Sequence, residues 1–159
     1  MIRSFVRSLA ALSLLLAATQ CDSPTGPLEA PAAFELRTVD GDALPAVWVE
    51  NEFVKTEVLA ETLYLYGDGT GLQRATYRST RPGQAPETYT SESRLEYTLD
   101  GARLEITFEC RDVVIRPAVC LAGPHAVGLA SDDVLRLATF FENSVVYRRV
   151  QAPVPVPEG

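Results

Sequence analysis

The chain has one histidine and one tryptophan among its 159 residues, and both scarcities restrict what it can do. A mechanism with a histidine base must use His125, and no Gly-x-Ser-x-Gly nucleophile elbow precedes this residue. A structural zinc site needs four ligands, whereas His125 has only Cys110 and Cys120 near it in sequence, so a carboxylate would have to be the fourth. Phosphate-loop and dinucleotide fingerprints are also absent. The sequence therefore favours a protein that is not an enzyme and has no metal or cofactor.

Hydrophobic runs long enough to span a bilayer are missing as well, because the apolar run Leu9–Ala18 falls short of the roughly 20 residues required. Arg3 and Arg7 precede this run, which is the layout of a secretory signal. The segment Leu16–Cys21 then resembles a bacterial lipobox, with Gln20 where that motif has a small residue. We therefore predict a signal peptide over residues 1–20 and lipidation at Cys21. The alternative is an ordinary signal cut before Cys21, which would leave a free thiol.

The segment after Cys21 is rich in Ser, Pro and Gly, which predicts a flexible linker over residues 21–32. Signal cleavage removes Arg3 and Arg7 from the 14 cations and none of the 21 acids, so the formal net charge changes from −7 to −9. Nucleic-acid binding depends on clustered Lys and Arg, and this acidic chain has no such cluster. We expect a lipid on Cys21 to attach the protein to a membrane of the cell envelope. Without that lipid the protein would be secreted or periplasmic.

Residues 33–150 have the size of one domain, and their patterning is that of β-strands. Polar and apolar residues alternate in Arg94–Leu99 and again in Ala102–Phe108, on either side of Asp100-Gly101. An Asp-Gly pair between two alternating segments predicts a hairpin. A two-residue turn would pair Tyr97 with Leu104 and would place Glu96 opposite Glu105, whereas a four-residue turn would pair Glu96 with Arg103. Both registers remain open.

Three more hairpins are expected, at Asp40-Gly41, at 67–71 and at 142–144. Only Phe53–Thr62 departs from this pattern of strands and turns, because its apolar residues have a spacing that also suits a short helix. The Asp132-Asp133 pair is expected to form the turn before Val134. The fold class that follows is all-β, an antiparallel meander forming a small barrel or sandwich of about eight strands. Residues 151–159 are rich in proline and should form an extended tail.

Cys110 and Cys120 are expected to form a disulfide, because an exported chain meets oxidising conditions and Pro117 lets the segment between them turn back. Such a bridge would stabilise the domain by roughly 2–3 kcal/mol. Free thiols, or a metal site that includes His125, are the alternatives.

The order of these strand and turn motifs resembles that of bacterial lipocalin-like proteins, many of which are exported lipoproteins. The motifs that carry the resemblance are Phe34–Gly41, Leu44-Pro45, Leu63–Thr70, Tyr77-Arg78, Leu99–Leu104 and Val146–Arg149. The Gly-x-Trp signature of a lipocalin first strand does not occur at Ala33–Leu36, and Trp48 lies beyond the first turn. Packing of Trp48 as an ordinary apolar residue is favoured over a role as a barrel plug. The resemblance implies a β-barrel and a small apolar ligand.

Alternation predicts that eight side chains point into one interior: Leu63, Leu65, Leu95, Tyr97, Leu104, Ile106, Leu135 and Leu137. An eight-stranded barrel is wide enough either to be filled by its own side chains or to hold one small ligand. We expect ligand contacts at Leu65, Tyr97, Leu104 and Ile106. Two hypotheses remain: a tethered barrel that binds a small apolar ligand, or a structural or interaction protein of the envelope with a filled core. An enzyme is the third.

Overall fold

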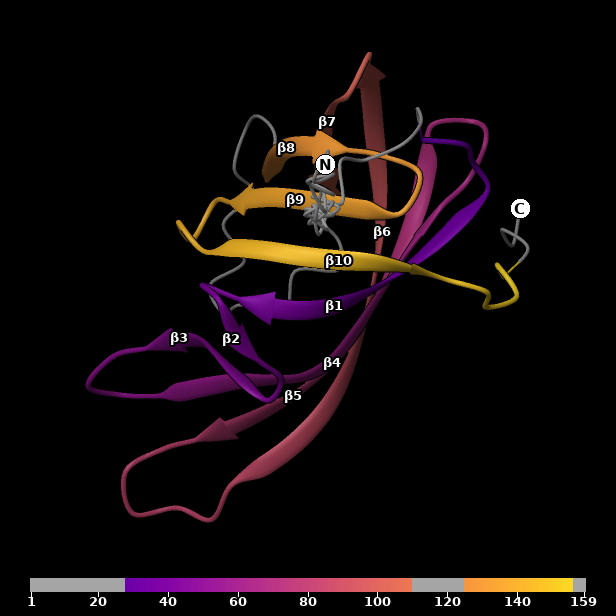
Figure 1. The fold of residues 1–159 in the computed structure, drawn as a ribbon. Coiled ribbons are helices and arrows are strands. Elements are labelled where there is room, and N and C mark those ends of the chain that lie inside the picture. The colour runs from indigo at the N-terminus through magenta and orange to yellow at the C-terminus, as the bar shows by residue number, and fades with distance from the viewer. Residues whose placement is uncertain (1–27, 110–124, 156–159) are drawn as a thin grey trace, which may run out of the picture.

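The computed structural model describes residues 28–109 and 125–155, and all its regular elements are strands. The ten strands are β1 (Ala32–Val39), β2 (Asp42–Ala43), β3 (Ala46–Glu50), β4 (Lys55–Leu65), β5 (Thr70–Thr80), β6 (Glu87–Asp100), β7 (Arg103–Phe108), β8 (Ala126–Ala130), β9 (Val134–Thr139) and β10 (Ser144–Val150). They form one antiparallel sheet, in the order β2-β1-β10-β9-β8-β7-β6-β5-β4-β3 (Figure 1). The prediction of an all-β antiparallel meander is confirmed.

The sheet closes into a barrel because β1 also pairs with β4. Eight strands, β1 and β4–β10, make up the barrel, and β2 and β3 are additional strands. The closing pair extends only from Ala32↔Leu65 to Glu35↔Thr62. Beyond it the two strands separate, since β1 then pairs with β2 while β4 pairs with β3. Long strands extend from this fork, and in Figure 1 β3, β4, β5 and the first part of β6 lie to the lower left, away from β7–β10.

The hairpin after β1 forms at Asp40-Gly41 as predicted, because Val39 pairs with Asp42. Asp40 and Gly41 have φ angles of 51° and 91°. Positive φ at both central residues is the requirement of a type I′ turn, and it is met by residues that tolerate it. The predicted turns between β4 and β5 and between β9 and β10 are also present.

The hairpin between β6 and β7 has neither of the registers considered from sequence. Asp100 pairs with Arg103, so the loop is Gly101-Ala102, and Tyr97 lies opposite Ile106 instead of Leu104. Gly101 has a φ of 61°, and glycine at the first central position suits a type II′ turn. This register also places Glu96 opposite Thr107 and Glu105 opposite Thr98, which avoids facing two carboxylates.

The segment that suited a short helix is the extended strand β4. The register of β4 against β5 shifts between Val58 and Ala60, which marks a β-bulge. A bulge inserts one residue, so inward-facing positions before and after it are three residues apart instead of two. Val58 and Glu61 are both buried for this reason, and their spacing imitates a helical period.

The predicted interior is confirmed for seven of the eight side chains. Leu63, Leu65, Leu95, Leu104, Ile106, Leu135 and Leu137 are each no more than 3% exposed and belong to one core cluster. Tyr97 is only partly buried and packs against that cluster. Trp48 also packs against the cluster, from β3, which agrees with the packing role favoured for it. Asp132 and Asp133 form the bend before β9, as expected.

At Gly128, β8 approaches β9 so closely that there is no room for a side chain. A Cβ atom there would overlap the Arg136 carbonyl oxygen and would lie 2.8 Å from the Leu137 Cα. Both neighbours are backbone atoms, so the strand would have to move. We expect Gly128→Ala to lower the free energy of unfolding by about 1–3 kcal/mol in urea titrations.

Gly67→Ala is the matched control, because the atom nearest to its Cβ would be the Ala30 carbonyl oxygen at 3.8 Å. The control should change the free energy of unfolding by less than about 0.5 kcal/mol. Equal effects of the two substitutions would contradict the close approach of β8 and β9.

Candidate functional site

Three of the four residues predicted to contact a ligand lie deep in the barrel core. Leu65, Leu104 and Ile106 are no more than 1% exposed and share the core cluster. Tyr97 lies beside it, and its hydroxyl donates a hydrogen bond to the Tyr66 carbonyl. The structure thus brings these residues together and packs them against the core. Ligand contact at these four residues stays a prediction.

The remaining predicted site residues, Cys21, Cys110 and Cys120, lie outside the described residues. The lipid anchor and the disulfide therefore stay predictions. His125 is described, and its Nδ1 accepts a hydrogen bond from the Phe108 backbone N–H at 3.1 Å. The two rings also meet edge to face, with centroids 5.8 Å apart. His125 thus joins β8 to β7, and no metal-binding group of three His, Cys, Asp or Glu side chains exists in 28–109 and 125–155.

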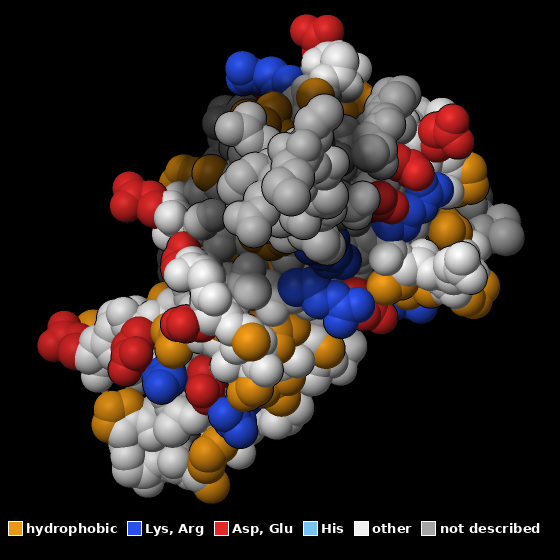
Figure 2. Space-filling view, viewed as in Figure 1, with side chains coloured by type: hydrophobic (Ala, Val, Ile, Leu, Met, Phe, Trp, Pro, Cys, Tyr) orange, Lys and Arg blue, Asp and Glu red, His pale blue; other side chains and the backbone are white. Residues whose placement is uncertain are grey.

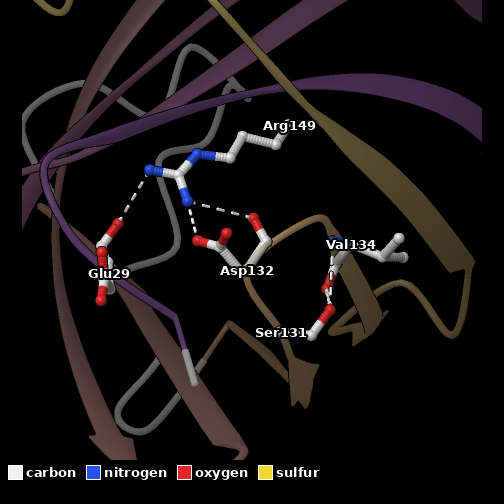
Figure 3. A network of polar contacts seen from close by, with 5 residues as sticks. All are labelled: Glu29, Ser131, Asp132, Val134 and Arg149. Carbon is white, nitrogen blue, oxygen red and sulfur yellow. Dashed lines mark hydrogen bonds and ion pairs between the residues drawn. The ribbon is translucent and has the colours of Figure 1, made fainter. Parts of the chain in front are cut away.

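Arg149, near the end of β10, makes polar contacts that stabilise one end of the barrel. Its guanidinium forms an ion pair with Asp132 and donates a hydrogen bond to the Asp132 carbonyl at 3.3 Å (Figure 3). It also donates to the Glu29 carbonyl at 3.3 Å, just before β1. The Ser131 hydroxyl stabilises the bend at Asp132-Asp133, because it donates a hydrogen bond to the Val134 carbonyl and accepts one from the Val134 N–H. We call this end the Arg149 end.

The opposite end is marked by Trp48, and we call it the Trp48 end. Asn143, in the turn before β10, donates a hydrogen bond from Nδ2 to the Trp48 carbonyl at 2.9 Å. This bond ties β3 to the β9–β10 turn. In Figure 2 the lower lobe, which β3–β6 form in this view, carries hydrophobic side chains interspersed with acidic and basic ones.

The inner face of β4, β5 and β6 changes from aliphatic to polar to aromatic towards the Trp48 end. Residues paired across a sheet share a face, so the register defines successive rows. From the Arg149 end to the Trp48 end, the four rows are Leu65–Gly71–Leu95, Leu63–Gln73–Ser93, Glu61–Ala75–Ser91 and Val58–Tyr77–Tyr89. The first of these rows is aliphatic, the second and third are partly polar, and the fourth contains two aromatic rings.

Glu61 is the charged residue of these rows, and its side chain is only 3% exposed. Two donors converge on its Oε1 atom: Gln73 Nε2 at 2.7 Å and the Tyr147 hydroxyl at 2.5 Å. The other oxygen, Oε2, is buried and has no hydrogen-bond partner among the described residues. A buried polar atom without a partner is rare in folded proteins and calls for an explanation.

Burial raises the pKa of Glu61, and the hydrogen bonds from Tyr147 and Gln73 and the nearby Tyr77 hydroxyl only partly offset this effect. Burial also raises the pKa values of Tyr77 and Tyr147, and the Glu61 carboxyl next to them adds to the rise. Both phenols are therefore neutral donors at physiological pH.

An aromatic row continues from this carboxyl towards solvent. The Tyr77 ring meets Trp48 edge to face, with centroids 6.5 Å apart, and it meets Tyr89 at 5.6 Å. Tyr89 is 38% exposed. Trp48, Tyr77 and Tyr89, called the aromatic row below, thus connect the solvent to the buried carboxyl.

The cations on these strands face the other way. Arg78 pairs with Glu57 at 2.9 Å, and Arg74 pairs with Glu92 at 2.5 Å. These positions alternate with the inward rows along β5, so the ion pairs lie on the outer face. A surface groove of about 380 Å³ lies farther out, between the β3–β4 and β5–β6 loops, with Glu50, Lys55 and Arg81 among its lining residues.

Sequence reasoning missed Glu61 and the aromatic row. The signal for Glu61 was present, because it stands two residues before Leu63, at the inward parity of β4. The helix-like spacing of the apolar residues in Phe53–Thr62 drew attention away from this parity.

No family model, curated protein or solved structure matches this chain. None of the described residues forms a helix long and apolar enough to cross a membrane.

Glu61 should make the stability of the domain fall as the pH rises. The folded state holds the Glu61 proton more tightly than the unfolded chain does, because the pKa is raised in the folded state. Its stabilising effect is fully present below the ordinary value of 4.5 and is lost as the pH rises through the raised value. We expect Glu61→Gln to remove this decline in urea unfolding measured from acidic to neutral pH.

Glu57→Gln is the control, because the Arg78 hydrogen bond lowers the pKa of Glu57 and so gives the opposite pH dependence. That variant should retain the decline with rising pH. An unchanged decline in Glu61→Gln would contradict the assignment to Glu61.

Proposed function

We propose that this protein is an exported, lipid-anchored and non-enzymatic β-barrel that binds a small, largely apolar ligand at its Trp48 end. The observation that carries the proposal is the inner face of β4–β6, which leads from the exposed Tyr89 along the aromatic row to a buried carboxyl with an unpartnered oxygen. Binding sites combine apolar and aromatic walls with a few placed polar groups, and this end supplies both. The packed Leu65, Leu104 and Ile106 would then support the site from below.

The direction of the chain agrees with a tether at Cys21. Glu29 is held at the Arg149 end by its hydrogen bond with Arg149, so the domain begins at the end opposite Trp48. A lipid on Cys21 would hold the Arg149 end towards the membrane. The Trp48 end would then face away from it, where a ligand can approach.

The chemistry of the polar groups supports binding over turnover. Tyr77 and Tyr147 have raised pKa values, so they act as neutral hydrogen-bond donors. His125 Nδ1 accepts a hydrogen bond from the Phe108 N–H, which gives this residue a structural role. The alternative, a structural envelope protein with a filled core, draws support from the core side chains that are 0–1% exposed.

Titration of the purified domain with phenethyl alcohol and with octanol tests the site directly. Trp48 is the only tryptophan, so its fluorescence reports on the Trp48 end alone. We expect a saturable change with both probes. Tyr89→Ala should lower the affinity for phenethyl alcohol about fivefold, because an aromatic contact contributes about 1 kcal/mol to binding.

Leu99→Ala is the matched control, because Leu99 is 37% exposed and Tyr89 38%, and Leu99 lies beside the β6–β7 turn. Leu99→Ala should leave the affinity for phenethyl alcohol unchanged. No saturable response to either probe would overturn the binding proposal in favour of the filled structural barrel.

The anchor is tested separately, by growing cells with a clickable fatty acid and comparing wild type with Cys21→Ser. We expect the label on the wild-type protein and none on the variant. Equal labelling, or no labelling of either protein, would contradict lipidation at Cys21.

A further inference from the structure

The interior of the Trp48 end has an acidic side chain without a positive partner among the described residues. Glu61 is 3% exposed, and the side chains around it are the uncharged Gln73 and Tyr77 of β5 and Tyr147 of β10. The neighbouring cations of β5, Arg74 and Arg78, are engaged with Glu92 and Glu57 on the outer face. Glu61 is therefore a carboxyl that, once ionised, has no counterion among the described residues, which is costly in a buried position.

The hydrogen-bond arrangement leaves a specific place for a donor. Gln73 and Tyr147 both donate to Oε1, whereas no described group makes a direct hydrogen bond to Oε2, and the Tyr77 hydroxyl interacts with the same carboxyl. A ligand group that fits must bring a proton donor, and a positive charge would also compensate the carboxylate. An ammonium group has three donors and one charge, and so meets both requirements.

The aromatic row adds a second attraction for a cation. Ring faces carry a negative potential that attracts ammonium groups within about 6 Å of the centroid, most strongly over tryptophan. Trp48 and Tyr77 meet edge to face, so their faces point in different directions and can border a cation on two sides. A carboxylate combined with aromatic walls is the chemistry that recognises organic amines.

We propose that the ligand of the Trp48 end is an amine with an apolar or aromatic body, whose ammonium group binds Glu61 Oε2 beside Tyr77 and Trp48. This inference rests on the proposed binding function and specifies the class of ligand. The body would lie along the aromatic row towards Tyr89. Tyr77 stands between Tyr89 and Glu61, so binding displaces its ring from the carboxyl.

Three probes with the same aromatic body test the charge preference: phenethylamine, phenethyl alcohol and hydrocinnamate, followed by Trp48 fluorescence. They present a cationic, a neutral and an anionic head group. We expect phenethylamine to bind about tenfold more tightly than phenethyl alcohol, because a hydrogen bond to a charged partner is stronger than a neutral one. Hydrocinnamate should bind most weakly, because its carboxylate meets Glu61.

Glu61→Gln should remove this preference, so that phenethylamine and phenethyl alcohol bind with similar affinities, because the amide keeps the shape of the carboxyl without its charge. Glu96→Gln, an exposed residue of the same strand as Tyr89, removes the same charge elsewhere and should preserve the preference. In the wild type, phenethylamine should bind more weakly as the pH is lowered through the Glu61 pKa. Gln73, Tyr77 and Tyr147, which face Glu61, do not titrate in that range.

The possible outcomes separate this inference from the function on which it rests. Saturable binding of phenethyl alcohol with no gain for phenethylamine would overturn the amine assignment and leave the binding function standing. A gain that persists in Glu61→Gln would overturn the role of Glu61. If none of the three probes binds, both proposals fail together.

Discussion

The short pairing between β1 and β4 is the constraint on which the rest of the structure depends. Four residue pairs, Ala32↔Leu65 to Glu35↔Thr62, convert an open sheet into a barrel. A longer pairing would remove the fork, and with it the separation of β1 and β4 that β2 and β3 occupy. Because Glu61 follows directly on the last of these pairs, the carboxyl lies where the closed barrel gives way to the extended β4–β6 sheet. The difference between the packed Arg149 end and the polar and aromatic Trp48 end follows from where the pairing stops.

Within the barrel the two ends are held by different kinds of interaction. At the Arg149 end, a guanidinium joins the last strand to the β8–β9 turn and to the segment before β1. At the Trp48 end, the ring contact between Trp48 and Tyr77 and the hydrogen bond from Asn143 to the Trp48 carbonyl connect elements that no strand pairing joins. Between them lies an apolar core whose largest side chains are almost fully buried.

Much of this fold could be predicted from period-two alternation and turn residues, and the exceptions have physical causes. Asp40-Gly41 forms the expected turn because both residues accept positive φ. The β6–β7 register differs because glycine at the first turn position and the separation of Glu96 from Glu105 favour a shifted pairing. The bulge at Val58 and Ala60 places Val58 and Glu61 on the same inner face three residues apart, and strict alternation before Glu61 does not predict that spacing. The aromatic row was not predictable, because Trp48, Tyr77 and Tyr89 come from three strands and meet only through the register.

The neighbours of β1 determine when the barrel can form. This first strand pairs with β4 on one side and with β10, the last strand, on the other. The β1–β10 ladder therefore requires nearly the whole chain, and such distant contacts slow folding. A chain emerging N-terminus first can form the β4–β5 and β5–β6 hairpins early, but its interior stays open to water until β10 arrives. Under the export that we propose, this late closure would keep the chain in a transportable state until β10 has crossed the membrane.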